Sequence, residues 1–155
     1  MVTDEAGRWS SKLPAGPSRS VAVTYEGDQR YLTDEADAGR LSVKTGAKLG
    51  LSRRHVPEGS GTTFQGRIER LGARIPSRGK LVQLQYQEPT SGRWSTVRNP
   101  FHTRSDGRFA FKYAFGTHYV TDVAIRFRLK VPPERRWPYR GTRTRPERVI
   151  VEARQ

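Results

Sequence analysis

Hydrophobic and polar residues alternate along several segments of this chain. In residues 109–115, aromatic side chains at every second position are separated by Ala and Lys. Residues 122–131 and 81–87 follow the same pattern, with Arg, Lys or Gln between the apolar positions. A period of two is typical of a strand with one buried face, and on a helix it would scatter the apolar side chains around the circumference. These segments therefore predict strands whose apolar faces pack against a second sheet.

Turn-forming residues separate the alternating segments, and Pro132 with Pro133 ends the longest strand because Pro cannot donate to a ladder. The pattern predicts seven strands, near residues 47–52, 62–69, 80–88, 93–98, 108–115, 119–131 and 147–153. About seven short strands in roughly 100 residues are typical of an immunoglobulin-like (Ig-like) β-sandwich, and short connections favour antiparallel pairing. We therefore expect an all-β, antiparallel Ig-like sandwich over residues 46–155. Its predicted core includes Val82, Leu84, Trp94, Phe109, Phe111 and Phe127.

The chain also contains a partial copy of itself. Residues 3–9 (TDEAGRW) align with residues 103–109 (TRSDGRF), since each has a polar turn, then Gly-Arg, then an aromatic residue that opens a strand. The strand at 20–25 and the segment 41–44 correspond to the last two long strands of the complete copy. Residues 1–45 are thus predicted to be the C-terminal part of an Ig-like repeat, with an incomplete sheet of three strands.

An incomplete sheet leaves apolar residues without cover and strand edges without partners. The residues concerned are Trp9, Leu13, Val21, Val23, Tyr25 and Leu32. Three outcomes are open: residues 1–45 pack on the complete domain, pair with another chain, or remain poorly ordered. The expected partners are neighbouring Ig-like repeats or another copy of the chain, through this sheet.

The repeated motifs resemble those of tandem Ig-like repeats in bacterial surface and secreted proteins, mainly of actinobacteria. The resemblance covers nearly the whole chain and is carried by residues 3–9, 13–19, 25–28, 79–82 and 92–94. It implies a spacer, stalk or adhesive module with no catalytic residues. We therefore expect a non-catalytic structural or adhesive module, outside the cell or on its surface. The polar opening of the chain contains no export signal, so such a signal would lie outside this sequence or not exist.

Charge suggests a second function. The chain carries 29 Lys and Arg against 15 Asp and Glu; residues 1–45 hold 6 and 7 of these, so residues 46–155 hold 23 and 8. A polyanion, either nucleic acid or an acidic cell-wall or glycan polymer, is therefore an alternative partner. Arginines on solvent-facing positions, with Trp137 packed at the end of the sandwich, are the other explanation. The candidate anion-binding residues are Arg126, Arg128, Arg135, Arg136, Trp137, Tyr139, Arg140, Arg143 and Arg145.

Other chemistry finds little support in the sequence. The absence of Cys excludes a disulfide, a thiolate zinc site and a Cys nucleophile. His102, Ser105 and Asp106 lie close together but are predicted to form a turn, and the acidic residues at 34–37 are predicted to be linker charge rather than a calcium site. No catalytic residue, metal site or cofactor is expected, and no apolar run approaches the ~20 residues of a membrane span.

Overall fold

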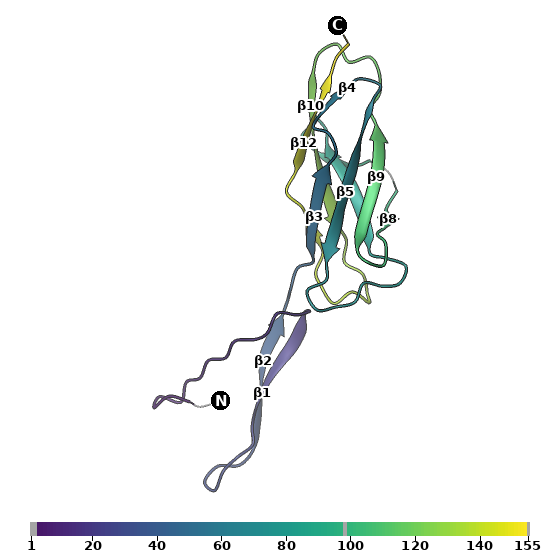
Figure 1. Cartoon of the computed structure of the whole chain (residues 1–155). Helices are drawn as coiled ribbons and strands as arrows, with labels where there is room; N and C mark the ends of the chain where they lie inside the picture. The colour runs from purple at the N-terminus through teal and green to yellow at the C-terminus, as the bar shows by residue number, and fades with distance from the viewer. Residues whose placement is uncertain (1–2, 98, 155) are drawn as a thin grey trace.

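The chain folds into strands joined by turns, and the computed structural model describes residues 3–97 and 99–154, in which no helix occurs. A β-sandwich formed by strands β3 to β12 stands above a two-stranded hairpin formed by β1 and β2 (Figure 1). The C-terminus lies at the end of the sandwich that is farthest from the hairpin (Figure 1).

One layer of the sandwich is a three-stranded antiparallel sheet in the order β3-β5-β9. The strands are β3 (Gly46–Leu51), β5 (Gly61–Glu69) and β9 (Arg108–Ala114). All three were predicted within one or two residues, because each alternates regularly between apolar and polar positions.

The second layer has the order β4-β12-β10-β6-β7, with β11 also pairing with β10 and β8 with β6. Its strands are β4 (His55–Pro57), β6 (Leu81–Gln87), β7 (Trp94–Thr96), β8 (Phe101–His102), β10 (Val123–Val131), β11 (Thr142–Arg143) and β12 (Glu147–Glu152). The expected all-β sandwich is therefore confirmed. One correction concerns direction, since β4 pairs with β12 in parallel, whereas antiparallel pairing was expected throughout.

Two buried clusters of side chains fill the space between the layers. Phe64 of β5 and Phe127 of β10 meet across the layers, with ring centroids 4.7 Å apart. Of the predicted core, Val82, Leu84, Phe109 and Phe127 are buried and Phe111 packs against the core. Trp94 was wrongly placed there: it pairs with Gln87 in the register, and its ring lies under the guanidinium of Arg128.

Buried polar groups close the end of the sandwich that faces the hairpin. The Lys80 side chain is fully buried; its ammonium donates to the carbonyl of Pro132 at 2.8 Å and also to the Glu134 carboxylate. The Trp137 indole nitrogen donates to the Thr45 hydroxyl at 2.8 Å, and Thr45 in turn donates to the carbonyl of Arg140 at 3.0 Å. These bonds tie the segment that leaves the hairpin to the loop between β10 and β11.

The hairpin consists of β1 (Arg19–Tyr25) and β2 (Asp34–Leu41), paired antiparallel with a bulge after Val21. The prediction of three strands was wrong in detail. Residues 9–13 form no strand, and the second strand covers 34–41, where linker charge had been expected, instead of 41–44.

The turns of the two sequence copies have the same hydrogen bonds. Asp4 N donates to Arg8 O at 2.8 Å and Gly7 N to Asp4 O at 3.0 Å; Arg104 N donates to Arg108 O at 2.8 Å and Gly107 N to Arg104 O at 2.9 Å. Both Gly7 and Gly107 have positive φ, which favours glycine at this position of each turn. The two turns therefore share their backbone geometry as well as their sequence pattern.

The ion pair between Lys80 and Glu134 generates a prediction about stability and pH. Burial by itself raises the pKa of Glu134, but the hydrogen bond and charge of Lys80, the amide of Leu81 and the charge of Arg78 together hold that pKa below its ordinary value of 4.5. Because the folded state has the lower pKa, this contribution to stability is fully present above that value and is lost as the pH falls through the folded pKa.

We therefore expect Glu134→Gln to lower the free energy of unfolding by about 1–3 kcal/mol at neutral pH, since it leaves the buried Lys80 without its counter-charge. Guanidinium denaturation of both proteins at neutral and acidic pH measures this, and the difference should shrink in acid. Arg78→Gln is the control, because Arg78 lies 3.8 Å from the same carboxylate and is exposed. An equal difference at both pH values would contradict the assignment.

Candidate anion-binding face

The loop between β10 and β11 holds five of the nine predicted residues, and it separates them into two groups. Arg135, Arg136 and Arg140 are exposed. Trp137 and Tyr139 are only 5 % and 3 % exposed, and the Tyr139 hydroxyl donates a hydrogen bond to the carbonyl of Leu71 at 2.6 Å. The prediction that Trp137 and Tyr139 bind an anion is therefore corrected, because both side chains belong to the core.

The sheet that contains β10 brings cationic side chains together on its outer face. Arg126, Arg128 and Lys130 alternate with the buried Phe127 and Leu129, so they point away from the core. The register places Arg148 of β12 beside Arg126, and Arg143 of β11 beside Lys130. We call this group the cationic face; its members are Arg126, Arg128, Lys130, Arg143 and Arg148.

Three members of the cationic face, Arg126, Arg128 and Arg143, were predicted from the sequence. Lys130 and Arg148 were missed, although the alternation in 122–131 already placed Lys130 beside the two arginines. Arg145 is exposed in the connection to β12, and the remaining arginines of the prediction lie at the end of the sandwich. There, Arg135 and Arg140 line a hollow with Arg40 of the hairpin.

Although Glu88 lines the same hollow as Arg126 and Arg148, no member of the cationic face forms an ion pair with a carboxylate within the described part of the chain. Ion pairs there join other cations to carboxylates, namely Lys48–Glu69, Arg54–Glu147, His55–Glu152, Arg78–Glu134, Lys80–Glu134 and Arg108–Asp106. Among the members of the face, Arg128 has neutral partners: its Nε donates to Gln85 Oε1 at 3.0 Å, and its guanidinium lies 3.9 Å from the centre of the Trp94 ring. Burial, and then the charge of Arg143, lower the pKa of Arg128 from its ordinary value.

Two pairs of like charges stand directly opposite one another on this face. Arg126 faces Arg148, and Lys130 faces Arg143. Like charges in directly opposed positions destabilise a sheet, by a few tenths of a kcal/mol to about 1 kcal/mol for a pair. A face that keeps two such pairs without an ion pair to a carboxylate in the described chain is arranged unfavourably for folding and favourably for an anionic ligand.

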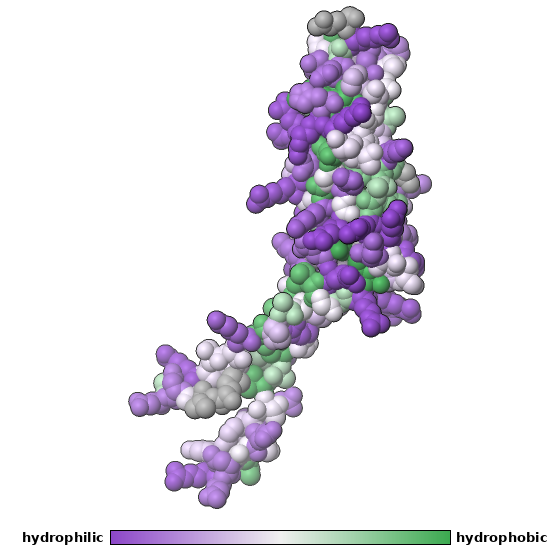
Figure 2. Space-filling model, in the orientation of Figure 1, coloured by the Kyte–Doolittle hydropathy of each residue, from purple (hydrophilic) through white to green (hydrophobic). Residues whose placement is uncertain are grey.

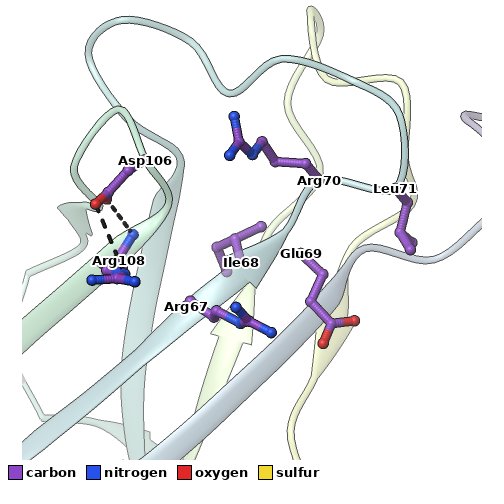
Figure 3. A pocket seen from close by; sticks show the side chains of 7 residues that line it. All are labelled: Arg67, Ile68, Glu69, Arg70, Leu71, Asp106 and Arg108. Atoms are coloured by element: carbon purple, nitrogen blue, oxygen red, sulfur yellow. Dashed lines mark hydrogen bonds and ion pairs between the residues drawn. The ribbon is translucent and has the colours of Figure 1, made fainter.

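The outer face of the other sheet differs, because its cations are mixed with acids. Figure 3 shows a hollow there in which Arg67, Arg70 and Arg108 lie beside Glu69 and Asp106. Arg108 Nε lies 3.9 Å from Asp106, and Lys48 binds Glu69 at 3.2 Å. Arg67 also stands opposite Arg108, but acids of the same hollow flank this pair. The sheet of β10 is therefore the better candidate for binding a polyanion.

Residues weighed for other chemistry lie in turns and strands. Ser105 and Asp106 belong to the turn that ends at Arg108, whose amide donates to Asp106 Oδ1 at 2.8 Å. The acidic residues at 34–37 are part of β2, where Asp37 accepts a hydrogen bond from the amide of Gly39 at 2.7 Å. Within residues 3–97 and 99–154, no three His, Asp or Glu side chains converge as ligands of a metal ion.

The hairpin exposes apolar side chains beside a hollow. Trp9 and Leu13 are 44 % and 49 % exposed, and with Val21 and Leu41 they line this hollow next to β1 and β2. Figure 2 shows hydrophobic residues at the surface of the hairpin region, while hydrophilic residues predominate on this view of the sandwich. The apolar face predicted to need cover is therefore only partly covered by the described residues of this chain, with Val21 and Val23 half-buried.

No family model matches the chain, and no curated protein matches it. None of the described residues forms a helix that is long and apolar enough to cross a membrane.

The opposed arginines generate a prediction about stability. Arg148→Glu replaces the repulsion of Arg126 by an attraction, so we expect the free energy of unfolding to rise by about 0.2–1 kcal/mol. Urea denaturation at low salt measures the change, and added salt should reduce it. Lys112→Glu is the control, because Lys112 stands opposite Thr63 and loses the same charge. A stability gain of equal size in both variants would show that only net charge matters.

Proposed function

We propose that this chain is a non-catalytic structural or adhesive module of an exported bacterial protein, built from Ig-like repeats in an array. One observation carries this proposal: the chain enters the complete sandwich at the end beside the hairpin and leaves it at the opposite end (Figure 1). A module with this arrangement holds its neighbours apart along its own length. The location outside the cell rests on the resemblance of the repeat motifs to those of surface proteins.

The strand order supports an Ig-like assignment. In constant-type immunoglobulin domains, one sheet contains strands A, B and E and the other contains C, F and G, with F in the centre. The order β3-β5-β9 corresponds to the first set, and the order β12-β10-β6 to the second. The short β4, which pairs with β12, allows the start of the domain to contact both layers.

The incomplete N-terminal sheet supports the array. If the sequence copies are aligned, β1 corresponds to β10 and β2 to β12. In the complete copy, β12 pairs with one edge of β10 and β6 pairs with the other edge. The corresponding edge of β1 has no partner among the described residues, and residues 20–25 on it carry no charge that would discourage pairing. We propose that a neighbouring repeat, or another copy of the chain, supplies the missing strands.

A fusion tests this proposal with the chain's own sequence. Placing a copy of residues 46–102 in front of Thr3 supplies counterparts of β3 to β8 to the hairpin. We expect residues 3–45 to become resistant to limited proteolysis, because the apolar face is then covered.

The matched control for the fusion carries Val82→Asp and Leu84→Asp in the added copy alone. These substitutions place charges on the face that has to cover the hairpin, so protection should be lost while the native sandwich stays folded. If the fusion leaves residues 3–45 as sensitive to protease as they are in the original chain, the hairpin is not the remainder of such a repeat.

A second candidate function is the binding of a polyanion by the cationic face. The specific observation is the grouping of five cations on one sheet without a carboxylate partner in the described chain. This function is compatible with the first, since an array repeats each face at regular intervals and several weak sites then act together.

A further inference from the structure

We propose that the cationic face binds a polyol phosphate polymer, in which short polyols are joined by phosphodiesters, in an extended form along β10. This inference rests on the second candidate function and names its ligand class. The argument uses the spacing of the cations, their neighbours on the adjacent strands and the place of the one aromatic ring on the face.

The spacing of the cations along β10 matches that of the phosphates. Arg126, Arg128 and Lys130 stand at every second residue, so successive positions lie about 6.6 Å apart. Two residues contribute six backbone bonds to an extended strand. A polymer of glycerol phosphate linked through its end carbons also has six backbone bonds between successive phosphorus atoms. Two extended chains with equal numbers of bonds per repeat stay in register over several repeats. The sugar-phosphate backbone of a nucleic acid has the same number of bonds per repeat, so the spacing selects a phosphodiester polymer and the aromatic ring of the face has to distinguish the two.

The adjacent strands strengthen both ends of this row. Arg148 lies beside Arg126, and Arg143 beside Lys130, at cross-strand Cβ distances of about 5 Å. A phosphodiester at either end of the row therefore meets two cations. This accounts for the two like-charge pairs, because the repulsion within each pair is relieved when an anion lies between its members.

The strand on the other side of the row offers neutral hydrogen-bonding groups. The register pairs Gln87 with Arg126, Gln85 with Arg128, and Gln83 with Lys130. Carboxamides both donate and accept hydrogen bonds, which suits the hydroxyl groups of a polyol. Gln85 is buried and its Oε1 accepts from Arg128, and Gln87 Nε2 donates to the carbonyl of Gly92 at 2.9 Å, so Gln83 is the carboxamide best placed to meet a hydroxyl of the polymer.

The aromatic ring on this face already stacks with a side chain of the protein. Proteins that bind single-stranded nucleic acid stack the bases on aromatic side chains. Among the described residues, Trp94 is the aromatic side chain that the register places on this face, and the Arg128 guanidinium lies over its ring at 3.9 Å. A polymer that presents only phosphates and hydroxyls therefore fits this face better than one that presents bases.

The test measures the binding of three fluorescein-labelled polymers to the full chain by fluorescence anisotropy. The polymers are a glycerol phosphate oligomer, an oligothymidylate with the same number of phosphates, and heparin. The face variant carries Arg126→Gln, Arg143→Gln and Arg148→Gln, and it leaves Arg128 in place because that residue packs on Trp94. The control, called the loop variant, carries Arg104→Gln, Arg135→Gln and Arg136→Gln, which remove the same charge from exposed loop positions outside the cationic face. Arg140 is left in place because it lines a hollow with Lys130 and Arg143.

We expect the chain to bind the glycerol phosphate oligomer at least as tightly as oligothymidylate, with affinity falling as salt increases. The face variant should lose about tenfold or more in affinity, since three phosphate contacts are removed, whereas the loop variant should stay within about threefold. Circular dichroism spectra that match the original chain would show that both variants are folded.

Three results would overturn the inference in different ways. If heparin binds through the cationic face and glycerol phosphate does not bind, the polyol phosphate ligand is rejected, while polyanion binding by this face is retained. Oligothymidylate binding more than tenfold tighter than glycerol phosphate shows that bases contribute. Equal losses in the two variants, or no binding of any polymer at low salt, remove the cationic face as a site altogether.

Discussion

Phe64 of one sheet and Phe127 of the other touch at the centre of the sandwich, and the rest of the molecule depends on the constraint that this contact satisfies. A strand that is apolar on one face must pack against a second layer. Burial of each large apolar side chain stabilises the fold by about 1.5–3 kcal/mol, and this stabilisation is absent when the side chain stays in water. The strands β3 to β12 meet the constraint within the chain. The hairpin does not, since β1 and β2 form a single layer with Trp9 and Leu13 largely exposed beside it.

The same constraint decides where function can lie. Once the inner faces of the two sheets cover one another, the residues between them are fixed, and the outer faces carry the chemistry that the chain presents. One outer face joins Lys48 and Arg108 to Glu69 and Asp106 in ion pairs, while the five cations grouped on the sheet of β10 form no ion pair in the described part of the chain, although Glu88 lies beside Arg126 and Arg148. The first arrangement is ordinary surface charge. The second retains repulsion within the sheet, which the proposed anionic ligand would relieve.

Much of the fold follows from local sequence. Alternation predicted the six long strands of the sandwich, because a period of two leaves no other arrangement of their apolar residues, whereas β2 of the hairpin was missed. The short β4, β8 and β11 escaped prediction, since two or three residues are too few to show a period. Trp94 was misplaced for a related reason: a three-residue strand does not reveal which of its faces is turned inward, and only the pairing with Gln87 settles it.

The candidate site shows where local sequence is insufficient. The arginines of 135–145 are conspicuous in the sequence because they are contiguous with Trp137 and Tyr139, yet both rings turn inward and bond to Thr45 and to the 70–71 backbone. The grouping that the structure does show joins Arg126 and Lys130 to Arg148 and Arg143, which are distant in sequence. Cross-strand register produces that grouping, and no local pattern contains it.

Hydrogen exchange on the unmodified chain is the most direct test of the central claim, that one repeat is complete and its sibling lacks a layer. If a covering layer is what protects these strands, amides paired between β10 and β12 should exchange slowly, near the rate set by global unfolding. Those paired between β1 and β2 should exchange orders of magnitude faster in dilute solution. Equal protection of the two strand pairs, in a chain shown to be monomeric, would contradict the account.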